Sequence, residues 1–320
     1  MSQQRKKPIL SVVVPCYNEA AVLNETANQL ETILTGLMKK GLIDDKSFIC
    51  FVNDGSRDLT WELILAHHER NSQLFRGTKL ARNSGHQNAL LAGLASVRDE
   101  ADCVVTIDAD LQDDVSVIEE FIVEYEKGCE IVYGVRKERK KDSFFKRFTA
   151  LFFYRLMKSM GVEIVNNHAD YRLISSRVVD DLDGFSEVNL FLRGIFPVIG
   201  YRSGYVYYDR KERFAGESKY PFGKMLSFAI DGITSFSVVP LRFVTLLGFI
   251  VFLASLLMGA FVIVDKIWLR QTVPGWASTV LPIYLIGGIQ IISLGVIGEY
   301  TGKIYKETKH RPRYIIETKV

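Results

Sequence analysis

The sequence lacks the short motifs that mark several large classes of nucleotide-binding and metal-binding proteins. No GxGxxG opens a predicted helix and no GxxxxGK[ST] occurs, so the phosphate-binding glycines of dinucleotide folds and P-loops are missing. The cysteines have no C-x-x-C spacing, which argues against zinc and dithiol chemistry. Each lies in or beside a predicted buried strand, which favours a reducing compartment: Cys16, Cys50, Cys103 and Cys129.

Charge and hydrophobicity are unevenly distributed along the 320 residues. The first residues, MSQQRKKPIL, contain no long apolar run, so we expect no signal peptide. The formal net charge of +3 is small, and we expect no nucleic-acid partner. Up to about Arg213 the pattern is that of a soluble α/β domain, whereas the last third contains two long uncharged runs.

Short apolar runs alternate with segments of helical periodicity in the first part of the chain. Strands are predicted at residues 10–14, 48–52 and 78–80, in a run that begins at Cys103, and at residues 130–135. This alternation predicts a mostly parallel sheet covered on both faces by helices. Ligands of such sheets bind beyond the carboxyl ends of the strands. One pocket should therefore collect the polar residues that follow the strands, namely 17–19, Asp54, 82–86 and 108–112.

Two aspartates follow the predicted strand that begins at Cys103, in the sequence CVVTIDADLQDD. Side chains two apart on an extended segment point the same way, so Asp108 and Asp110 can converge on one ligand. A hard cation such as Mg²⁺ or Mn²⁺ takes oxygen ligands of this kind, and Gln112 can add a carbonyl oxygen. The alternative for an isolated pair of this kind is a solvated acidic turn.

Four ordered motifs, VVVPCYNEA, VNDGSRD, ARNSGHQNAL and DADLQDD, resemble the nucleotide-sugar-binding half of an inverting GT-A glycosyltransferase of family 2. The later segments ADYRL and RFAGESKY, followed by the two uncharged runs, resemble the polyprenyl-phosphate glycosyltransferases. That group includes bactoprenol glucosyltransferases and dolichyl-phosphate mannose synthases. The resemblance covers essentially the whole chain and implies a Rossmann-like GT-A domain.

The resemblance implies a nucleotide-sugar donor and a divalent cation. Mg²⁺ or Mn²⁺ on Asp108, Asp110 and Gln112 would stabilise the charge that develops on the leaving diphosphate. The donor would be bound by Pro15, Tyr17, Glu19, Asp54, Arg82 and Asp108. Ordinary turn chemistry is the alternative for Glu19 and Asp54, and a surface ion pair is the alternative for Arg82.

The same resemblance implies a polyprenyl phosphate acceptor, whose anionic head needs cations. The candidates for binding the acceptor phosphate are Arg136, Arg139, Arg213, Ser218 and Lys219. The family's candidate catalytic carboxylate is Asp170, with Asp108 beside it. A phosphate nucleophile is mostly ionised at neutral pH, so we expect Asp170 to position the acceptor or stabilise the sugar carbon instead of removing a proton. A polar turn residue is the alternative reading of Asp170.

The uncharged runs, Phe243–Val264 and Gln271–Gly298, are each long enough to cross a bilayer as a helix. More positive charge flanks their outer ends than the loop between them, so both termini should face the cytosol. Two segments that combine aromatic and basic residues, 143–160 and 214–240, are predicted to lie in the membrane interface, although a core helix is the alternative for the first. The predicted organisation is therefore a catalytic domain at 1–213, an interfacial helix at 214–240, a transmembrane hairpin at 241–300 and a basic tail at 301–320.

These observations predict an enzyme of the inner (plasma) membrane that transfers one hexose, favouring glucose from UDP-glucose, to undecaprenyl phosphate with inversion. The alternatives are transfer of mannose from GDP-mannose, as in dolichyl-phosphate mannose synthases, or of an aminosugar. A non-catalytic membrane scaffold and a lipid-linked sugar flippase belong to other classes. Both uncharged runs are nearly free of ionisable groups, which argues against the flippase. Glycines in the second run would permit close helix contact, so a homo-oligomer is expected, and related enzymes suggest a tetramer.

Overall fold

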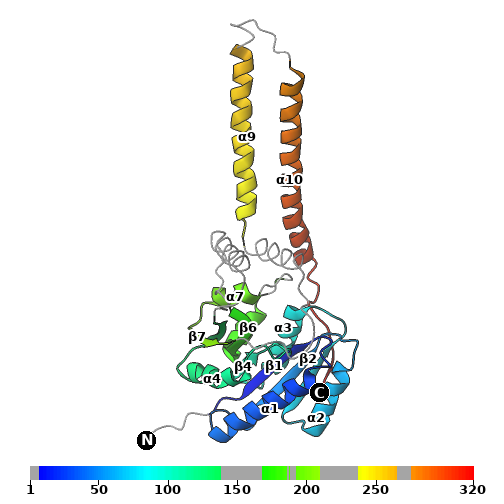
Figure 1. Cartoon of the computed structure of the whole chain (residues 1–320), viewed down its shortest axis with the longest axis vertical. Coiled ribbons are helices and arrows are strands. Elements are labelled where there is room, and N and C mark those ends of the chain that lie inside the picture. Colours follow the sequence, from blue (N-terminus) through cyan, green and yellow to red (C-terminus); the bar gives the residue numbers. More distant parts are fainter. Residues whose placement is uncertain (1–6, 138–167, 186, 188–191, 210–236, 265–274) are drawn as a thin grey trace.

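The computed structural model describes residues 7–137, 168–185, 187, 192–209, 237–264 and 275–320. An α/β domain forms one end of the molecule, and two long helices, α9 (Val239–Val264) and α10 (Trp276–Thr308), rise from it side by side (Figure 1). The predicted interfacial helix at 143–160 and nearly all of the one at 214–240 lie outside the described residues.

A single eight-stranded sheet, in the order β7-β5-β6-β4-β1-β2-β3-β8, forms the centre of the α/β domain. Its strands are β1 (Leu10–Cys16), β2 (Phe48–Asn53), β3 (Phe75–Leu80), β4 (Cys103–Thr106), β5 (Ile131–Arg136), β6 (His168–Ser175), β7 (Ser203–Tyr208) and β8 (Ile316–Lys319). β4, β1, β2 and β3 are parallel, whereas β6 runs antiparallel to β4 and β5, and β8 runs antiparallel to β3. The prediction of a mostly parallel sheet is therefore confirmed.

Helices follow the strands as the periodicity indicates. They are α1 (Leu23–Lys40), α2 (Thr60–Arg70), α3 (His86–Val97), α4 (Ile118–Glu126, after the 3-10 turn Val115–Val117), α6 (Ser176–Asp183) and α7 (Leu192–Ile199). The leucines that predict the inner face of α1 are all buried. α1 ends at Gly41, whose left-handed φ of 72° lets its N–H bond the last helical carbonyls.

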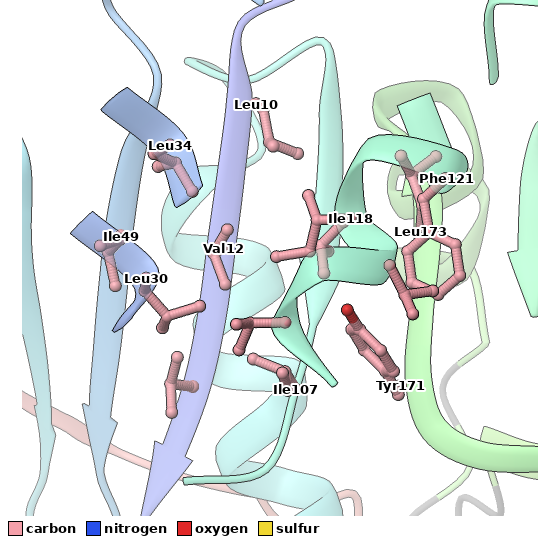
Figure 2. Close-up of a cluster of buried hydrophobic side chains, with 14 of the residues drawn as sticks. Leu10, Val12, Leu30, Leu34, Ile49, Ile107, Ile118, Phe121, Tyr171 and Leu173 are labelled. Carbon is pink, nitrogen blue, oxygen red and sulfur yellow. The ribbon is translucent and has the colours of Figure 1, made fainter. Parts of the chain in front are cut away.

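Helices bury both faces of the sheet. Figure 2 shows one of the two cores, in which Leu30 and Leu34 of α1 approach Val12 of β1. The same core continues to α4, where Phe121 stacks obliquely on Tyr171 of β6 with ring centroids 4.8 Å apart. The second core lies on the opposite face, between the sheet and helices α3, α6 and α7. Because both faces are covered, the polar ends of the strands are left as the place where a ligand can bind.

The membrane prediction is only partly supported. Among the described residues one helical segment, Leu285–Thr308 in α10, is long and apolar enough to cross a membrane, with a mean hydropathy of 1.2. In α9, the stretch Val239–Val251 is apolar but shorter than a span, counted over the side chains that the structure describes. The expected second transmembrane helix is therefore not confirmed, and the hairpin stays a prediction. Residues 316–319 of the expected basic tail form β8 and return to the edge of the sheet.

Candidate active site

The loop after β4 carries Asp108 into a cluster of ionisable side chains. β4 ends at Thr106, and the Thr106 hydroxyl donates a hydrogen bond of 2.6 Å to the Asp170 carbonyl, which joins this loop to the start of β6. His86, the first residue of α3, lies between the two carboxylates. Its Nε2 is 3.5 Å from Oδ1 of Asp108 and 3.7 Å from Oδ2 of Asp170. The structure thus brings together the two predicted catalytic residues, one on the loop after β4 and the other on β6, which is the neighbour of β4 in the sheet.

One oxygen of Asp108 is buried without a hydrogen bond. Oδ1 has no hydrogen-bond partner among the residues that the structure describes. Burial raises the pKa of the Asp108 carboxyl to about 6, the nearby His86 opposes this, and the carboxylates of Asp170, Asp113 and Asp110 raise it further. A buried carboxylate oxygen among other carboxylates needs a positive charge, and a bound cation would supply it.

A tight turn positions Asp110 next to Asp108. Leu111 has a left-handed φ of 57°, which is uncommon for a residue with a branched side chain. The turn brings the N–H of Gln112 to Oδ1 of Asp110, at 3.2 Å, and Gln112 is 9% exposed. The hydroxyl of Thr26 in α1 donates to the Ala109 carbonyl at 2.8 Å and fixes the turn to the rest of the domain. Asp110 is therefore held by a strained turn and not by a continuing strand.

The donor set at this turn fits a hard cation. Asp108 and Asp110 are the two carboxylates that could hold it, with Gln112 adjacent. The described residues contain no group of three or more His, Cys, Asp or Glu side chains arranged to hold a metal ion. Mg²⁺ usually takes one or two protein carboxylates and completes its shell with water and substrate phosphates, so two carboxylates are sufficient. The set does not fit a structural site that is closed by protein ligands alone.

Asp170 is bound by two arginines. Its Oδ1 accepts from Nη2 of Arg172 at 2.6 Å and from Nε of Arg193 at 3.1 Å, and its Oδ2 accepts from Nη2 of Arg193 at 2.9 Å. Burial alone would raise the pKa of Asp170, but Arg193 and then Arg172 hold that pKa well below its usual range. A carboxylate that is so firmly ionised is a poor proton acceptor, which agrees with the expectation that Asp170 is not a general base.

Asp54, a predicted nucleotide-binding residue, also organises the loop after β3. Its Oδ1 accepts from the N–H of Ser84 at 2.7 Å and its Oδ2 accepts from the N–H of Gly85 at 3.0 Å. The pKa of Asp54 is raised because burial outweighs these two hydrogen bonds. The loop held in this way carries Arg82, which is exposed, and leads directly into His86.

The other predicted donor-binding residues lie at or beyond the carboxyl end of β1. Pro15 is paired with Val52 inside the sheet, and Tyr17 is 37% exposed. The N–H of Glu19 donates to the hydroxyl of Thr60 at 3.0 Å, which ties this loop to the start of α2. With Asp54, Arg82 and Asp108 they occupy the carboxyl-terminal edge of the parallel strands, where the sequence predicts one pocket.

Arg136, a predicted acceptor residue, is already bound to a buried carboxylate. Its Nη2 lies 3.0 Å from Oδ1 of Asp113, which is 3% exposed, and its Nε is 3.3 Å from the hydroxyl of Tyr208. That hydroxyl donates to Asp113 at 2.5 Å. Arg136 therefore neutralises Asp113 in the structure, and a role in binding phosphate stays a prediction. The other four acceptor candidates lie outside the described residues: Arg139, Arg213, Ser218 and Lys219.

Sequence reasoning placed His86 in the expected pocket, within residues 82–86, but gave it no role, and it missed Arg193 altogether. The ARNSGHQNAL motif contains His86, yet a single histidine without metal-ligand spacing indicates no particular chemistry. Arg193 lies 23 positions after the carboxylate that it binds, in an apolar helix with no motif around it. Arg193 reaches the site because the beginning of α7 lies against the beginning of α3, where the N–H of Leu192 donates to Oε1 of Gln87 at 3.1 Å.

Comparisons with known proteins agree with this architecture. The model described as Glycosyl transferase family 2 matches residues 11–183. The uncharacterized glycosyltransferase YkoT of Bacillus subtilis (strain 168) is 53% identical over 314 residues, which is 98% of this chain and 93% of that protein. The bactoprenol glucosyl transferase of Shigella phage SfX is 38% identical over 314 residues, 97% of this chain and 99% of that protein.

Among solved structures, mannosyl-3-phosphoglycerate synthase from Rubrobacter xylanophilus has a similar fold. The TM-score is 0.50 and the sequence identity is 15%, over 71% of this chain and 73% of that chain. At this identity the likeness concerns the fold alone, which is the GT-A-like α/β sheet. The family model covers more than half of the chain and both relatives align along nearly all of it. The chain therefore belongs to glycosyl transferase family 2.

Proposed function

We propose that this protein transfers one hexose from a nucleotide sugar to the phosphate of a polyprenol, with inversion at the anomeric carbon. The favoured pair is UDP-glucose and undecaprenyl phosphate. The name of the phage relative, bactoprenol glucosyl transferase, supports this choice, since that protein is similar along almost the whole chain. The alternative donors are GDP-mannose and an aminosugar nucleotide.

The single observation that carries the proposal is the arrangement around Asp108. A carboxylate with one buried, unbonded oxygen and a second carboxylate on a strained turn lie at the carboxyl end of the parallel strands. A bound Mg²⁺ or Mn²⁺ would stabilise the negative charge of the leaving diphosphate. Asp108, Asp110 and Gln112 are the residues that would hold it. A cation held at this edge of the sheet suits a substrate that carries a diphosphate.

The remaining residues divide between donor and acceptor. Tyr17 and Glu19 lie on the loop after β1, and Arg82 lies on the loop after β3, at the edge where the nucleotide would bind. Asp54 holds the second of these loops in place. Asp170 lies on the other side of His86 from Asp108, where the acceptor would approach. Acceptor phosphate is mostly ionised at neutral pH and needs no strong base, so an Asp170 that stays ionised between two arginines suits a role in positioning.

The long helices support placement at a membrane. The described side chains of α9 and α10 expose many large apolar residues, including Phe243, Leu257, Ile291 and Leu294. Exposed apolar surface of this extent belongs against lipid or another protein. In the proposed arrangement both helices span the inner membrane, and the catalytic domain and both termini face the cytosol.

The glycines of α10 support the proposed self-association. A Cβ added at Gly287, Gly288, Gly295 or Gly298 would meet no atom within 4 Å in the described part of the chain, apart from the backbone of its own helix, which leaves room for a helix of a second copy. In a homo-oligomer, for which a tetramer is the favoured form, a helix of a neighbouring copy would pack against these glycines. A size measurement in detergent would test this, and a monomer at all protein concentrations would contradict it.

A panel of labelled nucleotide sugars tests the proposed reaction. We expect the purified full chain to transfer label from one UDP-sugar or GDP-sugar to polyprenyl phosphate when Mg²⁺ or Mn²⁺ is present, and to lose this activity with EDTA. Recovery of activity on adding back the cation is the control for damage by the chelator. If no donor labels the lipid although the protein binds nucleotide, the non-catalytic scaffold becomes the better account.

A further inference from the structure

The ring of His86 lies between the two carboxylates of the site and makes no hydrogen bond with the described part of the chain. Its Nε2 is 3.7 Å from Oδ2 of Asp170, which is too long for a direct hydrogen bond. The same nitrogen is 3.5 Å from Oδ1 of Asp108, an oxygen that accepts no hydrogen bond from the described residues either. The His86 side chain is 38% exposed, so a ligand can reach the ring from solvent.

Hydrogen bonds on both sides of His86 fix its backbone at the start of α3. Asp54 binds the two backbone N–H groups that directly precede His86 in the chain. Gln87, the next residue, accepts from the N–H of Leu192 at 3.1 Å, which holds the beginning of α3 against the beginning of α7. The neighbours of His86 therefore place the ring, and a ligand need not break a hydrogen bond in order to bind it.

The two flanking carboxylates determine which kind of group the ring can bind. A phosphate oxygen beside Nε2 would lie close to both Asp108 and Asp170, and like charges at such distances repel each other. A neutral hydroxyl avoids this repulsion. It donates one hydrogen bond and accepts others, so it can pair with an imidazole in either tautomer. An oxygen about 2.8 Å from Nε2 of His86 and from Oδ2 of Asp170 can bridge the gap between them.

We propose that His86 binds a hydroxyl group of the hexose that is transferred. This inference rests on the proposed function. A diphosphate held by a cation at Asp108 and an acceptor at Asp170 leave the hexose between them, and His86 lies there. A hydrogen bond to one hydroxyl would orient the sugar ring, and it would favour hexoses that carry this hydroxyl on the correct side. His86 would thus contribute to the choice of donor sugar.

Equilibrium binding of a nucleotide sugar and of its nucleoside diphosphate isolates the contribution of the hexose. The purified full chain in detergent is titrated with UDP-glucose and UDP, and with GDP-mannose and GDP, with Mn²⁺ present and without acceptor. We expect His86→Ala to weaken binding of the preferred nucleotide sugar about threefold to tenfold, as loss of one hydrogen bond requires. Binding of the matching nucleoside diphosphate should change less than about twofold. This ligand is the internal reference, because it reports any effect that His86 has through Asp108 and the cation.

Two further variants separate loss of the hydrogen bond from other effects. His86→Leu keeps an apolar side chain of some bulk at this position but has no polar atom, so we expect the same selective loss as in His86→Ala. His68→Ala is the matched control. Nδ1 of His68 lies 2.7 Å from the carbonyl of Phe75, the first residue of β3, at the opposite end of this strand from the site. We expect wild-type binding of both ligands in His68→Ala.

Equal weakening of both ligands in either His86 variant overturns the assignment, because His86 would then act through the cation or the fold. Unchanged binding of the nucleotide sugar overturns it as well. If the wild type transfers label and one of these results is found, the proposed reaction stands and only the hexose contact fails. If the selective loss is found but the wild type transfers no label to polyprenyl phosphate, the hexose contact stands and the proposed acceptor fails. A wild type that binds no nucleotide sugar removes both.

Discussion

Replacing Asp170 with asparagine should destabilise the α/β domain strongly, because Asp170 neutralises a buried cation. The Arg172 side chain has no exposed surface, and its Nη2 lies 2.6 Å from Oδ1 of Asp170. Asparagine keeps the shape of the side chain but removes its charge. The guanidinium of Arg172 would then remain in the interior without its carboxylate.

The magnitude follows from burial. Removing one partner of a buried ion pair costs about 3–5 kcal/mol of folding free energy. We count this cost only for the pair with Arg172, because Arg193 is partly exposed and solvent screens its pair with Asp170. For a domain of this size, about 1 kcal/mol lowers the melting temperature by roughly 2–4 °C, so the expected loss is about 6–20 °C.

The dependence on pH follows from the lowered pKa of Asp170. A carboxylate whose pKa is depressed in the folded state stabilises the fold above its unfolded pKa of about 4, and this contribution is lost as the pH falls further. The difference between the wild type and Asp170→Asn should therefore stay constant between about pH 5 and pH 8, and shrink only in stronger acid.

Thermal unfolding of the full chain in detergent, followed by tryptophan fluorescence, measures this effect. Asp183→Asn is the control, because Asp183 also binds an arginine, Arg98, at 3.0 Å but is 71% exposed. We expect little change in that variant. A melting temperature for Asp170→Asn within the range of this control would refute the view that Asp170 compensates a buried charge.

Three further predictions concern the cation and the packing. Asp108→Ala should abolish transfer while leaving the melting temperature near that of the wild type, and near-normal turnover would contradict the metal assignment. The Mn²⁺ concentration for half-maximal activity should rise as the pH falls through about 6, because protonated Asp108 no longer binds a cation; a constant value from pH 8 to pH 5 would argue against this. Gly93→Ala should lower the free energy of unfolding by about 1–3 kcal/mol, because a Cβ there would clash with Val13 and lie 2.7 Å from Cγ2 of Val52. The control is Gly36→Ala: this glycine faces open space within α1, so its replacement should be neutral or stabilising.

The fold was predictable where hydrophobic patterns are strong. The buried strands β1, β2 and β4 and the leucine face of α1 follow directly from apolar runs and periodicity. β3 begins earlier than predicted, at Phe75, because Arg76 and Gly77 interrupt the apolar pattern. β6, β7 and β8 were not predicted. β6 carries a fully buried arginine, Arg172, which is paired with Asp170 of the same strand, and β8 depends on pairing with β3.

The residues of the site were predictable where they belong to one short motif, and not where they bind residues far away in the sequence. The DADLQDD segment indicates a cation, and its aspartates do lie at the carboxyl end of a strand. Asp113 binds Tyr208, which lies 95 positions later in the chain, and Asp170 binds Arg193, which lies 23 positions later. No short sequence motif could reveal either pair. Asp54 binds backbone N–H groups, which every loop offers and no sequence pattern marks.

The return of β8 to β3 has a consequence for the order in which the protein can fold during synthesis. β8 follows α10 in the chain, and its Thr318 pairs with Lys79, while Lys79 Nζ lies 3.0 Å from Glu317. A ribosome that has completed the seven other strands must still make α9 and α10 before this edge of the sheet can close. Until then β3 presents unpaired backbone groups, which are a site for wrong pairing. Completion of the sheet therefore waits for the helices to be made, and the nascent domain is most vulnerable to aggregation while α9 and α10 are still emerging.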